Sequence, residues 1–473
     1  MPRRTRIVAT LGPATDRPGV LEALLDAGLD VARINFSHGV SEEPAQRIRR
    51  LRELAQRRNR NVAVLADLPG PKLRALLQGP ITLTAGATMA IGLKPDIHAD
   101  IDLTEPEALG KLKAGERVLL DDGRLQAVVA GVSNHLATLK ILVGGTLQPN
   151  KGVNLPDTDL DIPAVTERDR VAIGIALQAG ADWFALSFVR DASAARELRA
   201  VLGRDDVPIL AKIERPEAVA KSKEIIDAFD GIMVARGDLG VEIALEKVPH
   251  VQKKLIQQAR SAGKPVITAT DMLDSMRNNP RPTRAEVSDV ANAVYDGTDA
   301  VMLSGETAVG NHPVETVLCM KRVLEEAEIN QGEDGPRTVL VPRAQLLDYV
   351  THAICKLAHE IGAEAIIAPS ISGATVRLVA RHRPKQTIIA ITPDPAVARR
   401  LAVVWGVAAV PVPFNNETGH DLLEAAVQAA FRAGCVKAGA LVVVSAWHPT
   451  VGGPGFPTIR VVRVGADGRS CEA

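Results

Sequence analysis

Two side chains of opposite charge, Lys212 and Glu214, lie two positions apart in the apolar segment Pro208–Glu214. Successive side chains of a β-strand point to opposite faces, so these two share one face of a predicted strand. A surface ion pair is the alternative, but it fits poorly at the carboxyl end of an otherwise apolar strand. An ammonium beside a carboxylate at that position indicates a site for an anionic substrate and a cation.

A second carboxylate, Asp238, follows the next apolar segment, in Ile232–Gly240. Glycines flank it, and the free N–H groups of such a turn can hold a phosphate or a carboxylate. Asp238 could instead only cap a helix. Magnesium typically takes one or two protein carboxylates and completes its octahedron with water and substrate oxygens. Glu214 and Asp238, from neighbouring strands, fit that requirement.

A third polar group alternates along Val31–His38, where Arg33, Asn35 and Ser37 share one face of a predicted strand. The guanidinium fork of Arg33 suits a phosphate, and the other two offer neutral oxygens to a cation. A solvated strand face is the alternative, but it is rare in a parallel barrel, where both faces are buried. These three side chains should therefore border the same site.

The elements that position these residues are short apolar runs, each followed by a stretch of helical period, which is typical of parallel sheets. Eight such runs predict a closed (β/α)8 TIM barrel, in which active sites lie at the carboxyl ends of the strands. The runs are Arg6–Thr10, Val31–Asn35, Ala63–Asp67, Trp183–Phe188, Ile209–Ile213, Ile232–Val234, Val266–Ala269 and Ala300–Leu303.

Two further regions interrupt or follow the barrel. Residues from about 75 to 150 alternate like antiparallel strands and leave the barrel after its third strand, so they predict an inserted β-rich domain that could close as a lid. A passive insertion is the alternative. After the polar linker Gln331–Pro342, alternating helices and apolar runs predict a C-terminal layered α/β domain. The expected boundaries are 1–72 and 154–332 for the barrel, 73–153 for the inserted domain and 343–473 for the last.

The composition is that of an ordinary globular protein of several domains. Among 473 residues, 56 basic side chains balance 56 acidic ones, so no global field attracts nucleic acid or a membrane surface. There is no apolar leader and no apolar run long enough to span a bilayer, which favours the cytoplasm. The four cysteines, Cys319, Cys355, Cys435 and Cys471, lack the close spacing of a zinc site or a disulfide framework.

Strings around these residues resemble the pyruvate kinase family over nearly the whole chain. One string alone would be weak, but many occur in order and on the predicted strands. They are Ala9–Pro13, Ala32–Gly39, Gly70–Pro71, Lys151–Pro156, Lys212–Glu214, Met233–Gly240, Ala269–Leu273, Arg281–Glu286 and Met302–Thr307.

The resemblance implies transfer of the phosphoryl group of phosphoenolpyruvate to ADP, giving pyruvate and ATP, in glycolysis. It implies that Glu214 and Asp238 hold Mg²⁺ or Mn²⁺ and that Lys212 offsets charge on the transferring group. The remaining roles it implies are phosphoryl binding by Arg33, carboxylate binding by the backbone of Ala235, Arg236 and Gly237, proton handling near Thr270, and nucleotide binding by Asn35, His38, Arg74 and Lys151.

The chain departs from the family at the potassium position. Many members bind K⁺ with side chains matching Asn35, Ser37 and Asp67 and the carbonyl matching Leu68, and they usually carry Glu where Lys72 stands. Because an ammonium there reverses the local charge, Lys72 could supply the cation internally, which predicts potassium-independent activity. The alternative is that Lys72 points to solvent and the metal position persists.

The resemblance also identifies an effector loop in the last domain and suggests a homotetramer. No arginine stands in Gly419–Ala425, where some fructose-bisphosphate-activated members carry one, so a monophosphate effector such as AMP or a sugar phosphate, or no effector, becomes the expectation. A plain turn between a strand and a helix is the alternative for the loop. The loop residues are Ser370, Ser372, Gly373, Ala374 and Thr375.

Two other functions stay open on the sequence. A barrel lyase or aldolase could use the same metal and carboxylates on a pyruvate enolate, although it would have little use for a lid or Lys151. A catalytically silent metabolite-binding regulator would be expected to lose Lys212 or one of the two metal carboxylates, and all three remain.

Overall fold

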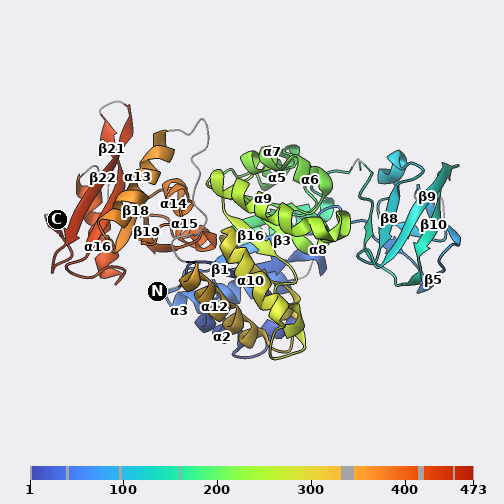
Figure 1. The fold of residues 1–473 in the computed structure, drawn as a ribbon, viewed down its shortest axis with the longest axis horizontal. Coiled ribbons are helices and arrows are strands. Elements are labelled where there is room, and N and C mark those ends of the chain that lie inside the picture. The colour runs from blue at the N-terminus through green and yellow to red at the C-terminus, as the bar shows by residue number, and fades with distance from the viewer. Residues whose placement is uncertain are drawn as a thin grey trace.

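The protein is described from a computed structural model, which covers residues 3–38, 42–94, 99–158, 160, 162–331, 346–413, 420–450 and 453–471. A closed barrel lies at the centre, with the inserted β domain on one side and the C-terminal domain on the other (Figure 1). This arrangement confirms the predicted fold class. The expected linker Gln331–Pro342 falls almost wholly outside the described residues.

The barrel has eight parallel strands in the order β1-β17-β16-β15-β14-β13-β3-β2. Each predicted apolar run corresponds to one of them; four runs have the same bounds as the strand, and the other four differ from it by one or two residues at an end. The strands are β1 (Arg6–Leu11), β2 (Val31–Asn35), β3 (Ala63–Leu68), β13 (Trp183–Leu186), β14 (Ile209–Ile213), β15 (Gly231–Ala235), β16 (Val266–Ala269) and β17 (Ala300–Leu303).

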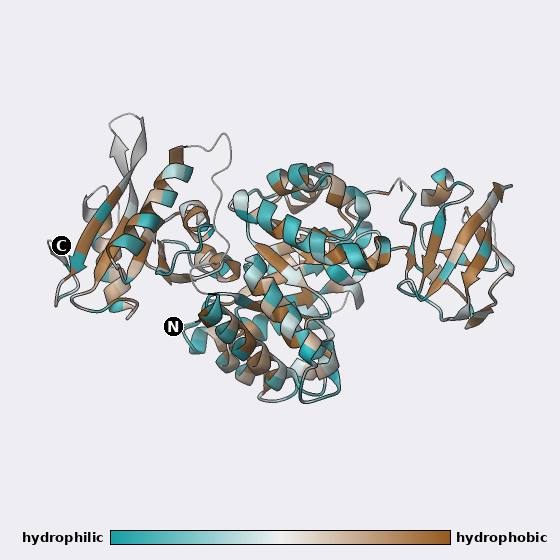
Figure 2. Cartoon of the chain, viewed as in Figure 1, coloured by the Kyte–Doolittle hydropathy of each residue, from teal (hydrophilic) through white to brown (hydrophobic). Residues whose placement is uncertain are grey.

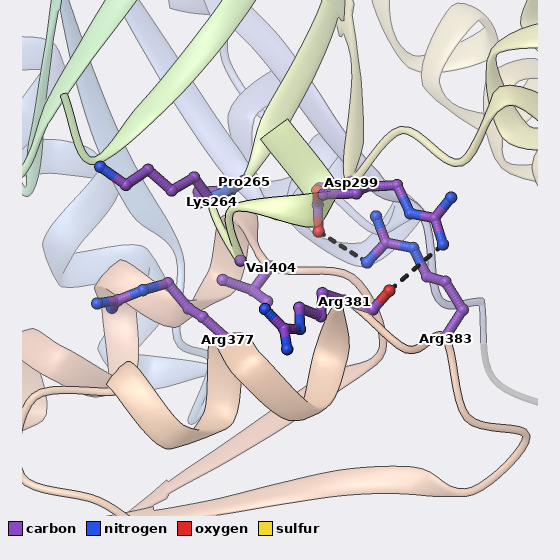
Figure 3. Close-up of a pocket in the computed structure, with 9 residues that line it drawn as sticks. Lys264, Pro265, Asp299, Arg377, Arg381, Arg383 and Val404 are labelled. Atoms are coloured by element: carbon purple, nitrogen blue, oxygen red, sulfur yellow. Dashed lines mark hydrogen bonds and ion pairs between the residues drawn. The ribbon is translucent and has the colours of Figure 1, made fainter. Parts of the chain in front are cut away.

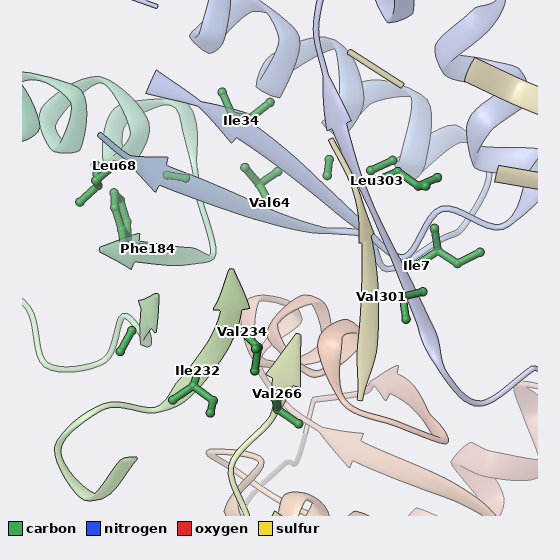
Figure 4. Packing of buried hydrophobic residues seen from close by; sticks show 14 of the residues in the cluster. Ile7, Ile34, Val64, Leu68, Phe184, Ile232, Val234, Val266, Val301 and Leu303 are labelled. Carbon is green, nitrogen blue, oxygen red and sulfur yellow. The ribbon is translucent and has the colours of Figure 1, made fainter. Parts of the chain in front are cut away.

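Helices surround the barrel, and their apolar faces pack on the outer strand side chains. Ile7, Val64 and Phe184 belong to the cluster that packs against these helices (Figure 4). Their sequence neighbours Val8, Leu65 and Ala185 belong to a separate cluster and point to the barrel interior. The helices are α1 (Pro13–Asp16), α2 (Val20–Ala27), α3 (Glu43–Arg57), α4 (Glu167–Ala179), α5 (Ser193–Leu202), α6 (Pro216–Ala220), α7 (Ser222–Ala228), α8 (Arg236–Glu242), α9 (Val248–Ser261), α10 (Arg284–Asp296), α11 (Gly305–Ala308) and α12 (Pro313–Asn330).

Figure 2 shows the consequence, with hydrophobic residues along the strands and hydrophilic residues on the outer helix faces. Two of the barrel helices begin at capping boxes that fix their starts. Thr166 accepts a hydrogen bond from the backbone N–H of Asp169 at the start of α4, and Thr283 accepts one from Glu286 at the start of α10. No helix in the described residues is both long and apolar enough to cross a membrane.

The inserted domain is antiparallel and has its own apolar core, which includes Leu120, Ala127 and Leu139. Its largest sheet has the order β12-β8-β9-β10-β6. The strands are β4 (Ala75–Leu76), β5 (Ile81–Leu83), β6 (Thr88–Gly92), β7 (Asp102–Leu103), β8 (Arg117–Leu120), β9 (Leu125–Ser133), β10 (Leu136–Val143), β11 (Gly145–Leu147) and β12 (Val153–Asn154).

The C-terminal domain is a six-stranded sheet in the order β20-β19-β18-β21-β22-β23, with helices packed against it. The last two strands of the sheet turn antiparallel, and β23 was not predicted. The elements are α13 (Leu346–Glu360), β18 (Ala365–Pro369), α14 (Ala374–Ala380), β19 (Thr387–Thr392), α15 (Pro395–Arg400), β20 (Val407–Pro411), α16 (His420–Arg432), β21 (Leu441–Thr450), β22 (Gly453–Val464) and β23 (Ser470–Cys471).

This domain docks on the amino-terminal ends of the barrel strands. The Arg6 side chain donates to the Val404 carbonyl (2.9 Å), and the Trp183 indole N–H donates to the Arg400 carbonyl (3.1 Å). The carboxyl ends of the strands, on the opposite side, are left for the inserted domain and the candidate site.

Candidate active site

The Lys212 ammonium is the centre of a polar cluster at the carboxyl ends of β3, β13 and β14. Its Nζ lies 2.7 Å from the Ser187 hydroxyl, 3.0 Å from Glu214 Oε1 and 3.3 Å from Asp67 Oδ1. Burial acts to lower the pKa of Lys212, but the Asp67 and Glu214 carboxylates outweigh it and raise that pKa. Lys212 therefore keeps its positive charge, at the place where the sequence predicted a site for an anionic substrate.

Asp67 joins Lys212 to Arg33. Arg33 Nε donates to Asp67 Oδ2 at 2.6 Å, and its NH1 donates to the Thr10 hydroxyl at 2.9 Å. The parallel register of β2 and β3 sets Asn35 opposite Asp67, which brings the polar face of β2 to the same place. Arg33 and Lys212 thus both contact the buried Asp67 carboxylate, which holds two positive charges close together. Such a pair of cations suits the binding of a phosphoryl group.

The Asp67 carboxylate predicts a pH dependence of stability. Burial acts to raise the pKa of Asp67, but Lys212 and Arg33 outweigh it, so the folded-state pKa is lowered. A lowered pKa stabilises the protein above the unfolded value of about 3.9, and that contribution is lost as pH falls through the folded pKa. Thermal melts of Asp67→Asn between pH 6 and pH 3 should therefore show a smaller acid-induced loss than the parent. An equal loss in both proteins would contradict this account of Asp67.

Glu214 is fully buried, and its two oxygens have different surroundings. Oε2 accepts the Phe188 backbone N–H at 2.8 Å, whereas the Lys212 ammonium, 3.0 Å away, is the one partner of Oε1 among the described residues. Burial raises the pKa of Glu214, the Lys212 charge opposes that rise, and Asp238 adds to it. An additional cation at Oε1 would offset both the cost of burying the Glu214 charge and the repulsion between Glu214 and Asp238.

Asp238 lies in the first turn of α8 and does not cap it, because the N-cap is Ala235. Its Oδ1 lies 3.1 Å from the Lys72 ammonium, which also approaches Asp122 at 3.8 Å. Within the described ranges no group of three or more His, Cys, Asp or Glu could hold a metal. Mg²⁺ does not require such a group, because substrate and water can supply the ligands that one or two protein carboxylates do not. Glu214 and Asp238 therefore suffice as protein ligands for a hard cation such as Mg²⁺.

Thr270 and Gly237 lie together just past the carboxyl ends of β16 and β15. The Gly237 N–H donates to the Thr270 hydroxyl at 2.7 Å, and that hydroxyl donates to the Ala269 carbonyl at 2.7 Å. Thr270 adopts φ +69°, which is strained for a β-branched residue and typical of functional sites. The Arg236 side chain pairs with Asp289 at 2.7 Å and donates to the carbonyls of Thr270 (2.6 Å) and Ala269 (3.2 Å).

The residues of the expected potassium position do not gather around Lys72. Asp67 is engaged by Lys212 and Arg33, the Leu68 carbonyl accepts the Ser187 hydroxyl at 2.7 Å, and Asn35 Oδ1 accepts the Ser37 N–H at 3.1 Å. Lys72 is instead beside Asp238 and 5.8 Å from the Phe188 ring centroid. It is partly buried and does not simply point to solvent.

Two of the four expected nucleotide residues, Arg74 and Lys151, lie at the junction with the inserted domain, whereas Asn35 ends barrel strand β2. Arg74 donates to the Asn150 carbonyl at 2.9 Å, and Lys151 pairs with Asp121 at 2.7 Å. The His38 side chain lies outside what the structure describes. These contacts hold Arg74 and Lys151 on the inserted domain, and neither contacts Lys212 or the two carboxylates.

The expected effector loop follows β18 in the C-terminal domain. The Ser370 hydroxyl accepts the Gly373 N–H at 2.9 Å, and Gly373 adopts φ +77°, which favours glycine. Thr375 is buried, whereas Ser372 and Ala374 are exposed. The loop is therefore a closed turn at the start of α14, in which the exposed Ser372 hydroxyl has no hydrogen bond to any described residue.

Three polar residues of the cluster were not singled out from the sequence. Ser187 links Lys212 to the Leu68 carbonyl, Thr10 orients Arg33, and Asp122 approaches Lys72. Ser187 stands at the carboxyl end of a predicted barrel strand, and that position alone was a usable signal.

Comparison with known proteins gives one consistent answer. The family model "Pyruvate kinase, barrel domain" matches residues 2–317, and "Pyruvate kinase, alpha/beta domain" matches residues 348–462. A pyruvate kinase of Geobacillus stearothermophilus is 44% identical over 478 residues, covering 99% of this chain and 81% of the relative. Pyruvate kinase 2 of Synechocystis is 42% identical over 459 residues, covering 94% and 77%.

A solved structure shows the same arrangement of domains. The crystal structure of a pyruvate kinase from Cryptosporidium parvum superposes with a TM-score of 0.87 at 34% identity, covering 98% of this chain and 96% of that one. Both comparisons extend over the barrel, the inserted domain and the C-terminal domain. The chain belongs to the pyruvate kinase family and is a phosphotransferase.

Proposed function

We propose that this site transfers the phosphoryl group of phosphoenolpyruvate to ADP with the help of Mg²⁺, giving pyruvate and ATP. The observation that carries the proposal is the buried Lys212 ammonium, held by Asp67, Glu214 and Ser187 at the carboxyl ends of the barrel strands. The phosphoenolpyruvate and ADP substrates follow from the family to which the chain belongs.

Lys212 and Arg33 bind the transferring group. The transition state of phosphoryl transfer is loose and spreads negative charge over the equatorial oxygens, so fixed cations stabilise it without reorganising. Asp67 holds both side chains in place, which keeps their geometry constant as the charge shifts.

Glu214 and Asp238 hold the divalent cation, Mg²⁺ or Mn²⁺. The buried Glu214 Oε1, whose one partner among the described residues is the Lys212 ammonium, supports this assignment, because a carboxylate oxygen can accept a further cation. A bound Mg²⁺ would neutralise charge on the substrate oxygens that complete its coordination shell. Lys72 Nζ lies 3.1 Å from Asp238 Oδ1, so a divalent cation held by Asp238 would lie close to that ammonium and would repel it.

The backbone of Ala235, Arg236 and Gly237 receives the substrate carboxylate. The Thr270 hydroxyl, which already links the Gly237 N–H and the Ala269 carbonyl, lies on the path by which a proton would reach the enolate. The strained backbone of Thr270 supports a role in the reaction beyond packing.

Asn35, His38, Arg74 and Lys151 serve the nucleotide. The inserted domain, 73–153, closes over the nucleotide as a lid. Arg74 and Lys151 belong to this domain and contact other residues of it, so they move with the lid. The segments 1–72 and 154–332 form the barrel, and 343–473 forms the regulatory domain.

A steady-state assay tests the function. Pyruvate formation, coupled to NADH oxidation by lactate dehydrogenase, should require phosphoenolpyruvate, ADP and Mg²⁺ together. Pyruvate formed without ADP would indicate a lyase or a phosphatase instead. An inactive, folded protein would favour the silent regulator.

Activity independent of potassium is the further expectation for this site. Lys72, which stands where many members carry a glutamate, places a positive charge at the active site, where it pairs with Asp238. In buffer free of potassium and sodium, adding KCl should change kcat less than twofold relative to equal ionic strength of a tetramethylammonium salt.

Lys72→Glu is the matched variant, because it restores the residue usual in the family. Its activity should fall without potassium and rise about tenfold or more when KCl is added, since about 1.4 kcal/mol of lost cation stabilisation is a factor of ten in rate. Strong activation of the parent by KCl would refute the replacement of potassium by Lys72.

Regulation and assembly complete the proposal. The loop of Ser370, Ser372, Gly373, Ala374 and Thr375 would receive a sugar monophosphate or AMP, and the chain would assemble as a homotetramer in the cytoplasm. Titration of AMP and sugar phosphates at subsaturating phosphoenolpyruvate tests the effector. Activation by fructose 1,6-bisphosphate alone would exclude the monophosphate reading.

A further inference from the structure

The inserted domain returns to the barrel through Asn154, the last residue of β12. The backbone of Asn154 belongs to the sheet of the inserted domain, because it pairs with Leu119 of β8. Its side chain contacts the barrel, because the amide Nδ2 donates to Glu242 Oε1 at 2.7 Å. Asn154 therefore holds the inserted domain with its backbone and the barrel with its side chain.

Glu242 connects this contact to Asp238. Glu242 is the last residue of α8, and Asp238 lies in the first turn of the same helix. The end of α8 also lies close to the inserted domain, since a Cβ at Gly123, between β8 and β9, would be 3.5 Å from the Val241 side chain. Backbone hydrogen bonds link the turns of a short helix, so a displacement at Glu242 reaches Asp238.

Arg215 connects the same contact to Glu214, which it follows directly in the chain. Its NH1 group lies 3.8 Å from Glu242 Oε1. Its NH2 group donates to two backbone carbonyls of the segment after β12, those of Leu155 at 3.2 Å and Thr158 at 3.4 Å. Both proposed metal carboxylates are therefore connected to the point where the inserted domain returns to the barrel.

Packing alone does not explain this cluster, because it buries a charge at a cost. Glu242 and Asn154 are buried, and Glu242 Oε2 and Asn154 Oδ1 accept no hydrogen bond from any described residue. Burial is the main cause that raises the pKa of Glu242, and the Arg215 charge opposes that rise. Apolar side chains of similar size would often give a fold at least as much stability as such a pair. A positioning role explains the cluster better than stability does.

The C-terminal domain is attached to the barrel in a different way. Its arginines form ion pairs with carboxylates at the amino-terminal ends of the strands. Arg383 pairs with Asp299 at 3.1 Å (Figure 3), and Arg399 pairs with Asp182 at 3.0 Å. These contacts lie at the end of the barrel opposite the metal carboxylates. A change at the metal carboxylates can therefore reach the inserted domain through adjacent residues, whereas the C-terminal domain is separated from them by the length of the strands.

We propose that Glu242 and Arg215 are positioning residues for the metal site, and that Asn154 is the pivot through which this site and the inserted domain affect each other. The inference rests on the proposed metal binding by Glu214 and Asp238. When these two carboxylates hold a cation, they would also hold α8 and Arg215 in place, and so restrict the inserted domain at Asn154. By thermodynamic linkage, release of the inserted domain from this contact would weaken metal binding by the same factor.

Titration of Mn²⁺ followed by electron paramagnetic resonance tests the proposal without catalysis. Glu242→Met keeps the length of the side chain but removes the carboxylate, and it should weaken Mn²⁺ binding ~10–100-fold, the usual cost of losing an outer partner of a metal ligand. Glu242→Gln keeps an oxygen for the Asn154 amide and should bind Mn²⁺ nearly like the parent. Because both substitutions remove the charge, the difference between them isolates the hydrogen bond to Asn154.

Two further variants complete the set. Asn154→Ala removes the same hydrogen bond from the other side and should weaken Mn²⁺ binding by a similar factor, which keeps the test independent of how well Glu242→Met folds. Arg117→Met is the matched control, since Arg117 pairs with Asp157 of the same segment at 2.7 Å but is exposed on the inserted domain. It should bind Mn²⁺ like the parent. Melting curves without metal should place each variant within a few degrees of the parent.

Hydrogen exchange measures the coupling in the opposite direction. Saturating Mn²⁺ should slow exchange of the backbone amides in β8 and β12 of the parent and of Glu242→Gln. In Glu242→Met, at a concentration of Mn²⁺ that saturates this variant, the same amides should exchange as fast as they do without metal. Equal slowing in the parent and in Glu242→Met would show that the contact does not couple the two sites.

The outcomes separate this inference from the proposed function. A parent that binds no Mn²⁺ would overturn the proposed metal site, and this inference with it. A parent that binds Mn²⁺, with Glu242→Met and Asn154→Ala binding equally tightly, would overturn this inference alone. An equal loss of affinity in Glu242→Met and Glu242→Gln would also overturn it, because charge rather than positioning would then be responsible.

Discussion

Replacing Lys212 with methionine should lower kcat for pyruvate formation by ~10³-fold, the upper range for loss of one preorganised electrostatic group. Methionine keeps the length of the side chain but removes the charge that faces Asp67 and Glu214. Because that charge acts mainly on the transition state, the KM for phosphoenolpyruvate should change much less than kcat. Steady-state kinetics with purified protein measures both constants.

Lys356→Met is the matched control, since Lys356 is an exposed lysine on α13 whose one ion pair within the described residues is with Glu360, at 3.8 Å. It should retain parental kcat. A melting curve of Lys212→Met should show a folded protein, because Arg33 still partners Asp67. More than a tenth of the parental kcat in Lys212→Met would contradict the role given to this ammonium.

The second large effect concerns the metal. Glu214→Gln should weaken Mn²⁺ binding by more than the ~10–100-fold that loss of a ligand's outer partner costs, because it removes one of two protein carboxylates. Titration of Mn²⁺ followed by electron paramagnetic resonance measures this affinity directly, without catalysis. Asp238→Asn should show a similar loss, while Asp122→Asn, next to the same lysine, should bind Mn²⁺ like the parent.

The same variant has a distinct effect on stability. A raised carboxyl pKa in the fold means that stability from this group is present at low pH and is lost as pH rises through the folded pKa. Removing the charge of Glu214 should therefore leave the melting temperature at pH 8 equal to or above that of the parent. A large drop in melting temperature, together with unchanged Mn²⁺ affinity, would show that Glu214 serves packing rather than the metal.

The barrel was predictable because its signal is local. Alternating apolar runs such as Val31–Asn35 and Ile209–Ile213 depend only on neighbouring side chains, and both became strands with those bounds. The fourth strand was predicted through Phe188 but ends at Leu186. Phe188 adopts φ +55° and turns its N–H to Glu214 Oε2, a contact with a residue 26 positions away that no local pattern indicates.

The site was predictable in part for a related reason. Parallel strands bring their carboxyl ends together, so Arg33, Lys212, Glu214 and Asp238 could be expected to lie close to one another. Ser37 was expected on the face of a strand, but it falls in the 3-10 turn Phe36–His38 that follows β2. The strand pattern does not extend past Asn35, because the chain must turn there toward α3.

Lys72 shows most clearly which contacts cannot be predicted from the sequence. The sequence indicated a positive charge near the expected potassium position, but not which carboxylate it would meet. The structure pairs it with Asp238, 166 residues away, while Lys212 and Arg33 take Asp67. Which carboxylates each of these three cations meets depends on three-dimensional distances, which sequence spacing does not encode.

Transfer of labelled phosphate tests the central claim most directly. Purified protein, phosphoenolpyruvate labelled with ³²P, ADP and Mg²⁺ should give labelled ATP and an equal amount of pyruvate, in buffer free of potassium and sodium. Lys212→Met should give neither at a comparable rate. Pyruvate with the label in inorganic phosphate, or labelled ATP formed equally fast by Lys212→Met, would contradict the account.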